Sequence, residues 1–268
     1  MSPGPAGRWL EEARLLLERF QDTQMEAVAE AASLAVEAID GGGLVHLFGT
    51  GHSRIPLEEM FPRYGSFPGF HPMAELSMTF HTQVTGSNGQ RQAMFIERVE
   101  GLADQILANY DFAAPDCFMV FSASGRSAVP IEMARGARRL GLPVVVVVSV
   151  AQSEAAPSGH SSGTKLVDHA DVVIDLGTPA GDALVRLDGL DTPVGPGSTL
   201  VYAAVVNEVK VQTAAALVER GSMPPVITAA SEVGEARAAS LFEAAYRQHA
   251  DRYARRLATG PEFTDEHA

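Results

Sequence analysis

Residues 117–127 read CFMVFSASGRS, and this stretch decides the fold. The first five residues are apolar, and a short apolar run of this kind is typical of a buried β-strand. The run passes directly into a loop with three serines and one glycine, and a helical pattern follows over about residues 128–140. Gly141 is a helix stop signal. The stretch is therefore predicted to form a strand, a ligand-binding loop and a helix.

Three more apolar runs predict strands, at about residues 44–48, 144–148 and 171–176. The second run is five consecutive valines, which is typical of a strand buried on both faces of a parallel sheet. Long helices are predicted over residues 198–220 and 235–257. Because strands alternate with helices along the chain, the sequence predicts an α/β fold with a parallel sheet.

The N-terminal part of the chain predicts a helical arm. Apolar residues recur at helical spacing from Arg8 to Asp40, and three glycines at 41–43 end the pattern. This segment accommodates one long helix or two. We therefore expect an arm over residues 1–40, followed by an α/β domain with C-terminal helices over residues 41–268.

The region between the first two predicted strands has a mixed pattern. A short helix is predicted at about residues 56–60. Residues 62–90 are rich in Gly, Pro and Ser and predict irregular structure, whereas residues 91–110 predict a helix.

Charge and cysteine content exclude several classes of protein. The 268 residues carry 20 Lys and Arg against 33 Asp and Glu, a net charge of −13. An acidic chain binds nucleic acid and anionic membranes poorly, so neither is expected as a partner. The one cysteine, Cys117, excludes an internal disulfide and Cys-based zinc clusters, and its apolar neighbours predict an inert buried thiol. The sequence has neither a signal-peptide pattern nor an apolar run of membrane-spanning length, which predicts a cytoplasmic protein.

The first motif, GTGHS at residues 49–53, follows the first predicted strand. A dinucleotide fingerprint would need a third glycine where Arg54 stands and an acidic residue near Phe70 and His71. The motif is therefore interpreted as a glycine turn that lets backbone N–H groups approach a small anion or a sugar. The alternative is a tight turn without a ligand.

The second motif, SASGRS at residues 122–127, precedes a helix. Unpaired N–H groups and the helix dipole favour an anion at a helix N-terminus, and the hydroxyls add donors. No Gly-Lys-Ser/Thr follows, so the loop is not a nucleotide P-loop. We predict a phosphate cradle. The alternative is that one serine only caps the helix, which explains one of the three hydroxyls and leaves the other two unexplained.

The two motifs together resemble the SIS (sugar isomerase) domain family of phosphosugar proteins, whose signature S-x-S-G-x-S/T stands at residues 122–127. The resemblance covers about residues 8–220. It implies a Rossmann-like three-layer αβα sandwich with a five-stranded parallel sheet, and a dimer or tetramer with sites near the subunit interface. Residues 162–166 and 181–182 are most similar to a SIS subgroup of phosphosugar isomerases to which no firm reaction is assigned.

The resemblance also gives expectations for the ligand. It implies a sugar phosphate, with the serine loop on the phosphate and the glycine turn on the sugar. Arg54 directly follows the glycine turn, and Arg126 follows the glycine of the serine loop. Either arginine could neutralise the phosphate, and the alternative is an exposed surface arginine. Ser149 ends the valine strand, where SIS proteins present a polar group to substrate. The expected binding residues are Gly51, Ser53, Arg54, Ser122, Ser124, Gly125, Arg126, Ser127 and Ser149.

Residues 57–65, LEEMFPRYG, are similar to segments of phosphoheptose isomerases and of N-acetylmuramic acid 6-phosphate etherases. Both families place a catalytic glutamate at the position of Glu59. Isomerisation and elimination of sugar phosphates both need a base that removes a proton next to a carbonyl. Glu59 is therefore the expected catalytic base. The alternative is a solvated helix glutamate.

Several residues are candidates for the second catalytic group. Residues 99–104, VEGLAD, resemble the etherase motif, yet the etherase's second glutamate falls on Ala103. A different group must then complete the proton transfer. The candidates are His52, His81, Glu100 and Glu208.

The favoured function is an enzyme that acts on a 6-phosphorylated amino sugar by C2 proton abstraction. Elimination at C3 is favoured, as water from N-acetylglucosamine 6-phosphate or as lactate in an etherase-like reaction. The alternatives are an aldose–ketose isomerase and a non-catalytic phosphosugar-binding regulator. This chemistry needs no cofactor and no metal, and none is predicted.

Overall fold

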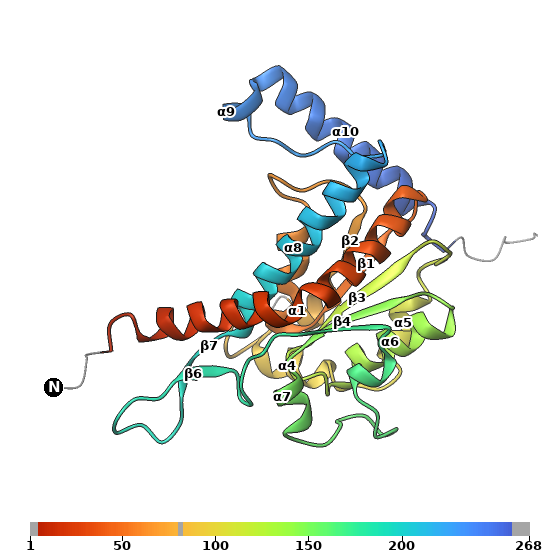
Figure 1. The fold of residues 1–268 in the computed structure, drawn as a ribbon. Helices are drawn as coiled ribbons and strands as arrows, with labels where there is room; N and C mark the ends of the chain where they lie inside the picture. Colours follow the sequence, from red (N-terminus) through yellow and green to blue (C-terminus); the bar gives the residue numbers. More distant parts are fainter. Residues whose placement is uncertain (1–4, 80–82, 259–268) are drawn as a thin grey trace, which may run out of the picture.

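The computed structural model describes residues 5–79 and 83–258. Its centre is a parallel sheet with strand order β2-β1-β3-β4-β5 (Figure 1). The predicted α/β fold with five parallel strands is confirmed. The strands are β1 Val45–Gly49, β2 Phe70–Met73, β3 Cys117–Phe121, β4 Val144–Val148 and β5 Val172–Asp175.

Helices cover both faces of this sheet and make three layers. In β4, Val145 and Val147 pack into the core under α1, α2 and α8. Their neighbours Val144, Val146 and Val148 pack into the second core, under α5 and α6. Because successive side chains of a strand point to opposite faces, an all-valine strand stabilises both cores. These helices are α1 Arg8–Asp40, α2 Ile55–Met60, α5 Leu102–Leu107, α6 Ala128–Arg139 and α8 Ser198–Glu219.

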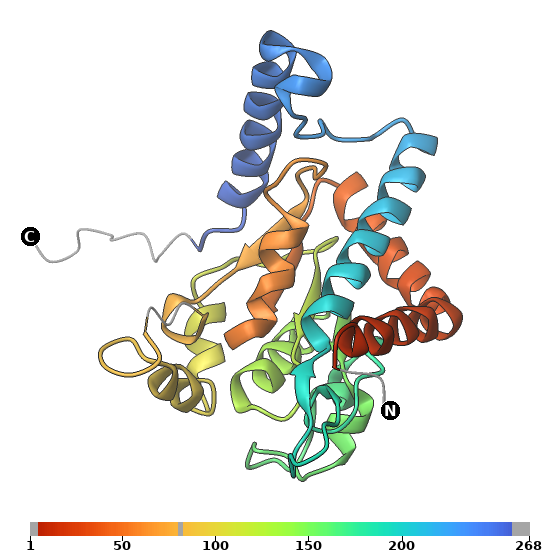
Figure 2. The ribbon, with the colours of Figure 1, turned by 90° about the vertical axis from the view of Figure 1, so that its left-hand side faces the viewer.

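The N-terminal arm is one continuous helix, α1, which runs beside α8 across one face of the sheet (Figures 1 and 2). At its start, Trp9 Nε1 donates to the carbonyl of Pro196 at 3.2 Å. At its end, Arg220 pairs with Glu37 and Asp40. The apolar side of the arm is thus buried against its own chain.

The structure differs from the sequence predictions between residues 62 and 110. The region predicted as irregular contains the edge strand β2. Its sequence FHPM includes a proline, which an edge strand tolerates because one side of its backbone makes no ladder bonds. The single helix predicted over residues 91–110 is two helices, α4 Gln90–Ile96 and α5, with Gly101 between them at φ +86°.

The hairpin of β6 Ala183–Val185 and β7 Val194–Pro196 was not predicted either. Of the helices in the described ranges, α8 has the length and apolarity of a membrane span, but 44% of that stretch is buried inside the chain, as in a core helix. Cys117 is buried, as predicted, and burial raises the pKa of its thiol to about 12. The short elements are η1 Gly51–Arg54, α3 Leu76–Thr79, α7 Val150–Glu154, η2 Leu166–His169 and α9 Ala230–Val233.

The C-terminal helix α10, Glu235–Ala254, docks at the amino end of the sheet, while its first turns and α9 project outward (Figure 2). Arg252 donates to the carbonyls of Ile39 and Gly43, both at 2.8 Å, and so binds the end of α1. The fully buried Asp116 accepts from Arg256 and from the backbone of Leu44.

Three histidines meet under the docked part of α10. His46 is fully buried, with Nε2 at 3.1 Å from Asp116, and Nδ1 of His71 lies 3.5 Å from Nε2 of His249. Burial lowers the pKa of all three, that of His71 to about 3 and that of His249 to about 4. The cluster therefore stays neutral at physiological pH.

We predict that stability falls as the pH drops below about 6.5, the ordinary pKa of histidine. Below that value the unfolded chain binds protons that folded His71 and His249 refuse until about pH 3 and pH 4. The free energy of unfolding should then decrease by up to about 1.4 kcal/mol per pH unit for each histidine. Urea unfolding at pH 7.5, 6.5, 5.5 and 4.5 measures the slope, which should be smaller in His249→Phe. A stability that stays constant from pH 7.5 to 4.5 would contradict the prediction.

Candidate functional site

The two motifs lie side by side because β1 and β3 are neighbours in the sheet. Gly49, the last residue of β1, pairs with Phe121, the last residue of β3. Glycine is required at 49, since a Cβ there would lie 2.1 Å from the carbonyl oxygen of Ser53. Gly51 begins η1 at φ +54°, a left-handed conformation that favours glycine. Both loops therefore emerge at the carboxyl edge of the sheet, where parallel sheets bind ligands.

The serine loop, residues 122–127, is a tight turn before α6. The backbone N–H of Gly125 points at the carbonyl oxygen of Ser122 (3.1 Å) and at its hydroxyl (3.2 Å). Gly125 has φ +60°, and a Cβ there would approach Val148 to 2.9 Å. Ser124, which stands between Ser122 and Gly125 in the loop, is half-buried. Ser127 is the N-cap residue of α6. The loop is therefore a tight turn that leads into the N-terminus of α6, with the N–H of Gly125 engaged inside the turn.

Glu97, just after α4, joins the two motifs. Its carboxylate accepts from the hydroxyl of Thr50 at 2.6 Å and from the hydroxyl of Ser127 at 3.1 Å. Its backbone carbonyl accepts from the N–H of Val129 in the first turn of α6 at 3.0 Å. Glu97 was not predicted as a site residue, because a glutamate in a segment predicted as one helix looks like a solvated side chain.

Glu59 lies on α2 and faces α8. Its carboxylate accepts from Nδ2 of Asn207 at 2.9 Å and pairs with Arg63. Nζ of the buried Lys210 donates to the backbone carbonyl of Glu59 at 3.0 Å and to Oδ1 of Asn207 at 3.2 Å. Asn207 and Lys210 were not predicted as site residues. The polar residues that interrupt the valines of this helix were the available signal.

These contacts keep Glu59 ionised. Burial by itself would raise the pKa of its carboxyl, but the hydrogen bonds from Asn207 and Arg63 and the charges of Arg63 and Lys210 outweigh it. The net effect holds the pKa of Glu59 below its ordinary value. The lowered pKa makes this carboxylate a weaker base than a free glutamate, but it keeps the carboxylate in the unprotonated form that a general base needs.

Glu59 also lines a cavity of about 480 Å³ between α2 and α10. The cavity walls are Ile55, Glu58, Glu59, Pro62, Arg63, Tyr64, Ile227, Phe242 and Tyr246.

Helix α8 connects Glu59 to the glycine turn. The hydroxyl of Tyr202 lies 3.2 Å from Oγ of Ser53, whereas Asn207 contacts Glu59. Five residues of helix separate the two contacts, a rise of about 7.5 Å. Ser53 and Glu59 are therefore held by one rigid helix a short distance apart.

Some predicted site residues are engaged elsewhere. Ser149 is fully buried, caps α7 and donates its hydroxyl proton to the carbonyl of Thr178 at 2.7 Å, so it does not present this group to a substrate. Nε of Arg126 donates to the carbonyl of Pro157 at 2.7 Å. Arg54 pairs with Glu58.

The candidates for the second catalytic group are dispersed. Glu208 is exposed on α8, on a different side from the Asn207 and Lys210 that meet Glu59. His52 is exposed in η1. His81 lies outside the described residues. Ala103, where the etherase resemblance places the second glutamate, is fully buried in the core under α5 and α6.

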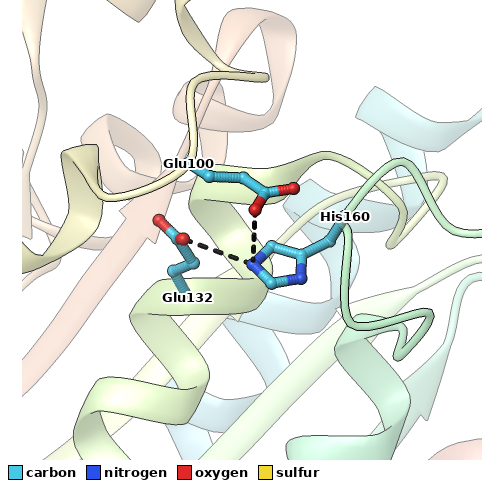
Figure 3. Close-up of side chains that lie close together, drawn as sticks. All are labelled: Glu100, Glu132 and His160. Atoms are coloured by element: carbon cyan, nitrogen blue, oxygen red, sulfur yellow. Dashed lines mark hydrogen bonds and ion pairs between the residues drawn. The ribbon is translucent and has the colours of Figure 1, made fainter.

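Glu100 belongs to a separate polar cluster with Glu132 of α6 and His160 (Figure 3). Nε2 of the buried His160 lies 3.2 Å from Glu132 and 3.9 Å from Glu100. These three side chains are of metal-ligating types. However, each carboxylate oxygen already accepts a hydrogen bond, from Gly101 or from Ser161. The hydrogen bonds from Ser161 hold the pKa of Glu100 below its ordinary value.

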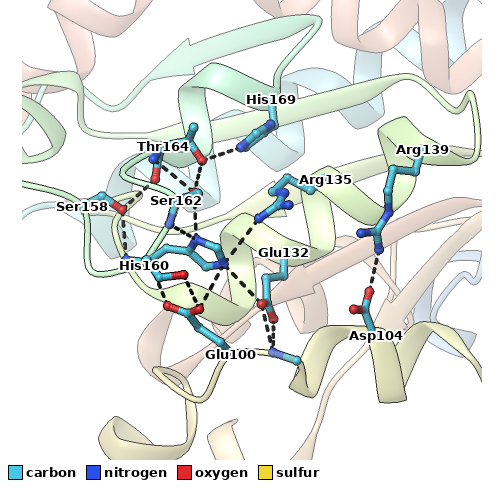
Figure 4. A network of polar contacts seen from close by, with 12 residues as sticks. Glu100, Asp104, Glu132, Arg135, Arg139, Ser158, His160, Ser162, Thr164 and His169 are labelled. Atoms are coloured by element: carbon cyan, nitrogen blue, oxygen red, sulfur yellow. Dashed lines mark hydrogen bonds and ion pairs between the residues drawn. The ribbon is translucent and has the colours of Figure 1, made fainter.

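This cluster is part of a larger polar network that extends to Ser158, Ser162 and Thr164 (Figure 4). The segment that carries His160 packs on the loop through two backbone hydrogen bonds, from Gly159 to Arg126 and from Leu166 to Gly125, both at 2.9 Å. An arginine of α6, Arg135, also lies 3.4 Å from Nε2 of His160. The cluster therefore connects α6 to this segment.

A known protein family matches more than half of the chain. Residues 8–149 match the SIS domain. The chain therefore belongs to the SIS domain family.

Within the family, the chain is 36% identical over 225 residues to a UPF0309 protein of Streptomyces coelicolor, which covers 83% of this chain and 87% of that protein. It is 34% identical over 211 residues to a UPF0309 protein of Listeria innocua, with 79% and 83% covered. Among solved structures, a phosphoheptose isomerase from Francisella tularensis has a TM-score of 0.48 at 16% identity, over 76% of this chain and 94% of that one. The Vibrio vulnificus NanR protein, solved with ManNAc-6P, has a TM-score of 0.46 at 14% identity, over 82% and 64%.

We predict that Asn207→Ala raises the pKa of Glu59, because it removes a hydrogen bond to the charged form of the carboxyl. Carboxyl-carbon NMR titration of the wild type and the variant measures the shift. Glu100, which is held by Ser161, is the control in the same spectra and should titrate alike in both proteins. An unchanged or lower pKa of Glu59 in the variant would show that Asn207 does not hold its charge.

Proposed function

We propose that this SIS-domain protein is an enzyme that acts on a 6-phosphorylated amino sugar, with Glu59 as the base that removes the C2 proton. The observation that carries the proposal is the ionised carboxylate of Glu59, positioned by Asn207 and Arg63 on the wall of a cavity. The amide of Asn207, which comes from another helix, holds one oxygen of this carboxylate, and the guanidinium of Arg63 holds the other. Glu59 is therefore fixed in position, unlike a glutamate that is freely solvated on a helix surface.

The serine loop is proposed to hold the phosphate. The chain is strongly acidic, so an anion must be bound by local donors rather than by the field of the whole protein. The N-terminus of α6 supplies a positive dipole end, and Ser122, Ser124 and Ser127 supply hydroxyls. Gly51 and Ser53 would contact the sugar from the neighbouring turn.

The proposed reaction begins from the open-chain sugar, whose C1 carbonyl acidifies the C2 proton. Glu59 takes that proton, and the electron pair of the C–H bond forms the C1–C2 double bond of an enolate, with the negative charge on the C1 oxygen. In elimination, the C1 carbonyl re-forms, the C2–C3 double bond forms and the C3–O bond breaks, and the departing oxygen takes a proton and leaves as water or as lactate. In isomerisation of a sugar with a C2 hydroxyl, the C1 oxygen gains a proton, the C2 hydroxyl loses its proton to become the ketose carbonyl, and a proton is added at C1. An N-acetyl group at C2 blocks simple ketose formation, so an acetylated substrate favours elimination.

The lyase assignment takes its support from residues 57–65 and 99–104, which resemble the etherase segments. Because Ala103 stands where the etherase has its second glutamate, the carboxylate that would assist lactate release is absent. Loss of water is therefore favoured over loss of lactate. An isomerase and a binding regulator share the same cradle and are separated by experiment.

We expect turnover of N-acetylglucosamine 6-phosphate in D₂O to give a 2,3-unsaturated sugar phosphate whose mass is lower by one water, with new ultraviolet absorbance. N-acetylmuramic acid 6-phosphate, tested in parallel, reports lactate release. A ketose formed from a non-acetylated hexose or heptose phosphate, with no change of mass in H₂O, would identify an isomerase. Binding of these sugars without turnover would identify a regulator.

The variant Glu59→Gln tests the base in the same assay. It should lower turnover by about 10²–10⁴-fold while substrate binding survives, because the shape remains and the base is lost. Glu58→Gln is the matched control, since the neighbouring side chain is 65% exposed and pairs with Arg54. Near-normal turnover in Glu59→Gln would remove Glu59 from the mechanism.

We also propose that a second copy of the chain covers the cavity beside Glu59. Three aromatic residues of its wall, Tyr64, Phe242 and Tyr246, are 67%, 42% and 42% exposed, and the first turns of α10 project from the body of the chain. Exposed aromatic side chains of this kind are typical of an interface.

Light scattering at micromolar concentration should therefore show a dimer or a tetramer. Phe242→Glu should weaken the assembly, because it places a charge in an apolar contact, whereas Arg247→Glu on another side of α10 should not. A monomeric wild type would contradict a site completed by two subunits.

A further inference from the structure

Glu97 places a negative charge directly at the serine loop. Its carboxylate accepts one hydrogen bond from the hydroxyl of Thr50 in the glycine turn and one from the hydroxyl of Ser127 in the serine loop. The first turn of α6 contains no acidic residue, and the hydroxyl of Ser127 makes no capping bond to the helix. The carboxylate of Glu97 therefore occupies the hydroxyl of Ser127, the N-cap residue of α6.

A bound phosphate would need the same donor. A serine hydroxyl has a single hydrogen to donate, and Ser127 spends it on Glu97 at 3.1 Å. If Ser127 donates to a phosphate oxygen, its bond to Glu97 must break. The carboxylate and the phosphate also carry the same sign of charge, so they disfavour one another at this distance.

We propose that Glu97 is an internal competitor for the phosphate group at the serine loop, a residue that a ligand must displace from Ser127. The inference rests on the proposed phosphate cradle but not on the reaction that follows binding. The displacement needs only the side chain to rotate, because the backbone carbonyl of Glu97 stays bonded to Val129. Thr50, which is buried, can keep the other carboxylate oxygen.

The competition makes the affinity for phosphate depend on Glu97 in an unusual direction. A carboxylate that helped to bind the ligand would weaken binding when it is neutralised. A carboxylate that competes with the ligand strengthens binding when it is neutralised. Glu97→Gln keeps the size of the side chain and its backbone bond while it removes the charge.

The experiment is calorimetric titration of the full chain with inorganic phosphate and with glucosamine 6-phosphate. We expect Glu97→Gln to bind both about tenfold more tightly than the wild type, because Ser127 gains a charge-assisted bond to the ligand. Asp104→Asn is the matched control, since it removes one charge on α5 from an exposed pair with Arg139 and should bind like the wild type. Melting temperatures check that each variant is folded.

The double variant Glu97→Gln/Ser127→Ala tests the route. Glu97→Gln should gain less affinity in the Ser127→Ala background than in the wild type, because the contested hydroxyl is gone and only the charge repulsion is relieved. Equal or weaker binding by Glu97→Gln than by the wild type overturns the inference, and so does a gain of the same size in the Ser127→Ala background. Absence of phosphate binding in every protein overturns both the inference and the cradle. Tighter binding by Glu97→Gln without turnover of any sugar phosphate leaves the inference standing and overturns the proposed reaction.

Discussion

The site depends on the pairing of Gly49 with Phe121 at the ends of β1 and β3. In a parallel sheet, neighbouring strands release their loops at the same edge, so this one register pair brings the glycine turn beside the serine loop. The turn itself exists only because residue 49 has no Cβ. Glu97 can bridge Thr50 and Ser127 because the two loops are held this close.

Helix α8 imposes the second constraint. It is buried against α1 and the sheet, yet it carries Tyr202, Asn207 and Lys210 toward the elements that follow β1. Burying these polar groups costs free energy unless each finds a partner, and Ser53 and Glu59 are the partners. The position of Glu59 and the polar residues of the core helix therefore depend on each other.

The sequence was sufficient for the parts of the chain where local pattern and burial agree. The valines of β4, the serine loop and the helix after it predict a strand, a turn and a helix, and the structure contains all three. The prediction was wrong for β2, because its sequence contains a proline and lies between two turn-rich segments. The strand forms through its pairing with β1, which the local sequence does not show. The split between α4 and α5 escaped because Gly101 was interpreted within a helical period.

Within the site, loop residues were predictable and contacts between distant residues were not. A serine loop shows its chemistry in sequence, but the partner of Ser127 lies 30 positions earlier, and the partner of Glu59 lies 148 positions later. The same limit explains Ser149, whose position at the end of a strand suggests a ligand, although its hydroxyl closes α7 and meets Thr178.

The charge distribution then suggests how an acidic chain can be selective. Free phosphate offers oxygens alone, so it must displace Glu97 with what the serine loop supplies. In the proposed site, a phosphorylated sugar would gain further hydrogen bonds from the glycine turn, and these would offset the loss of the Ser127–Glu97 bond. A competitor inside the cradle weakens every phosphate ligand equally, so it does not change the ratio of their affinities, but it keeps free phosphate out of the cradle at concentrations at which the phosphorylated sugar binds. The discrimination itself would come from the contacts that the sugar side of the site adds.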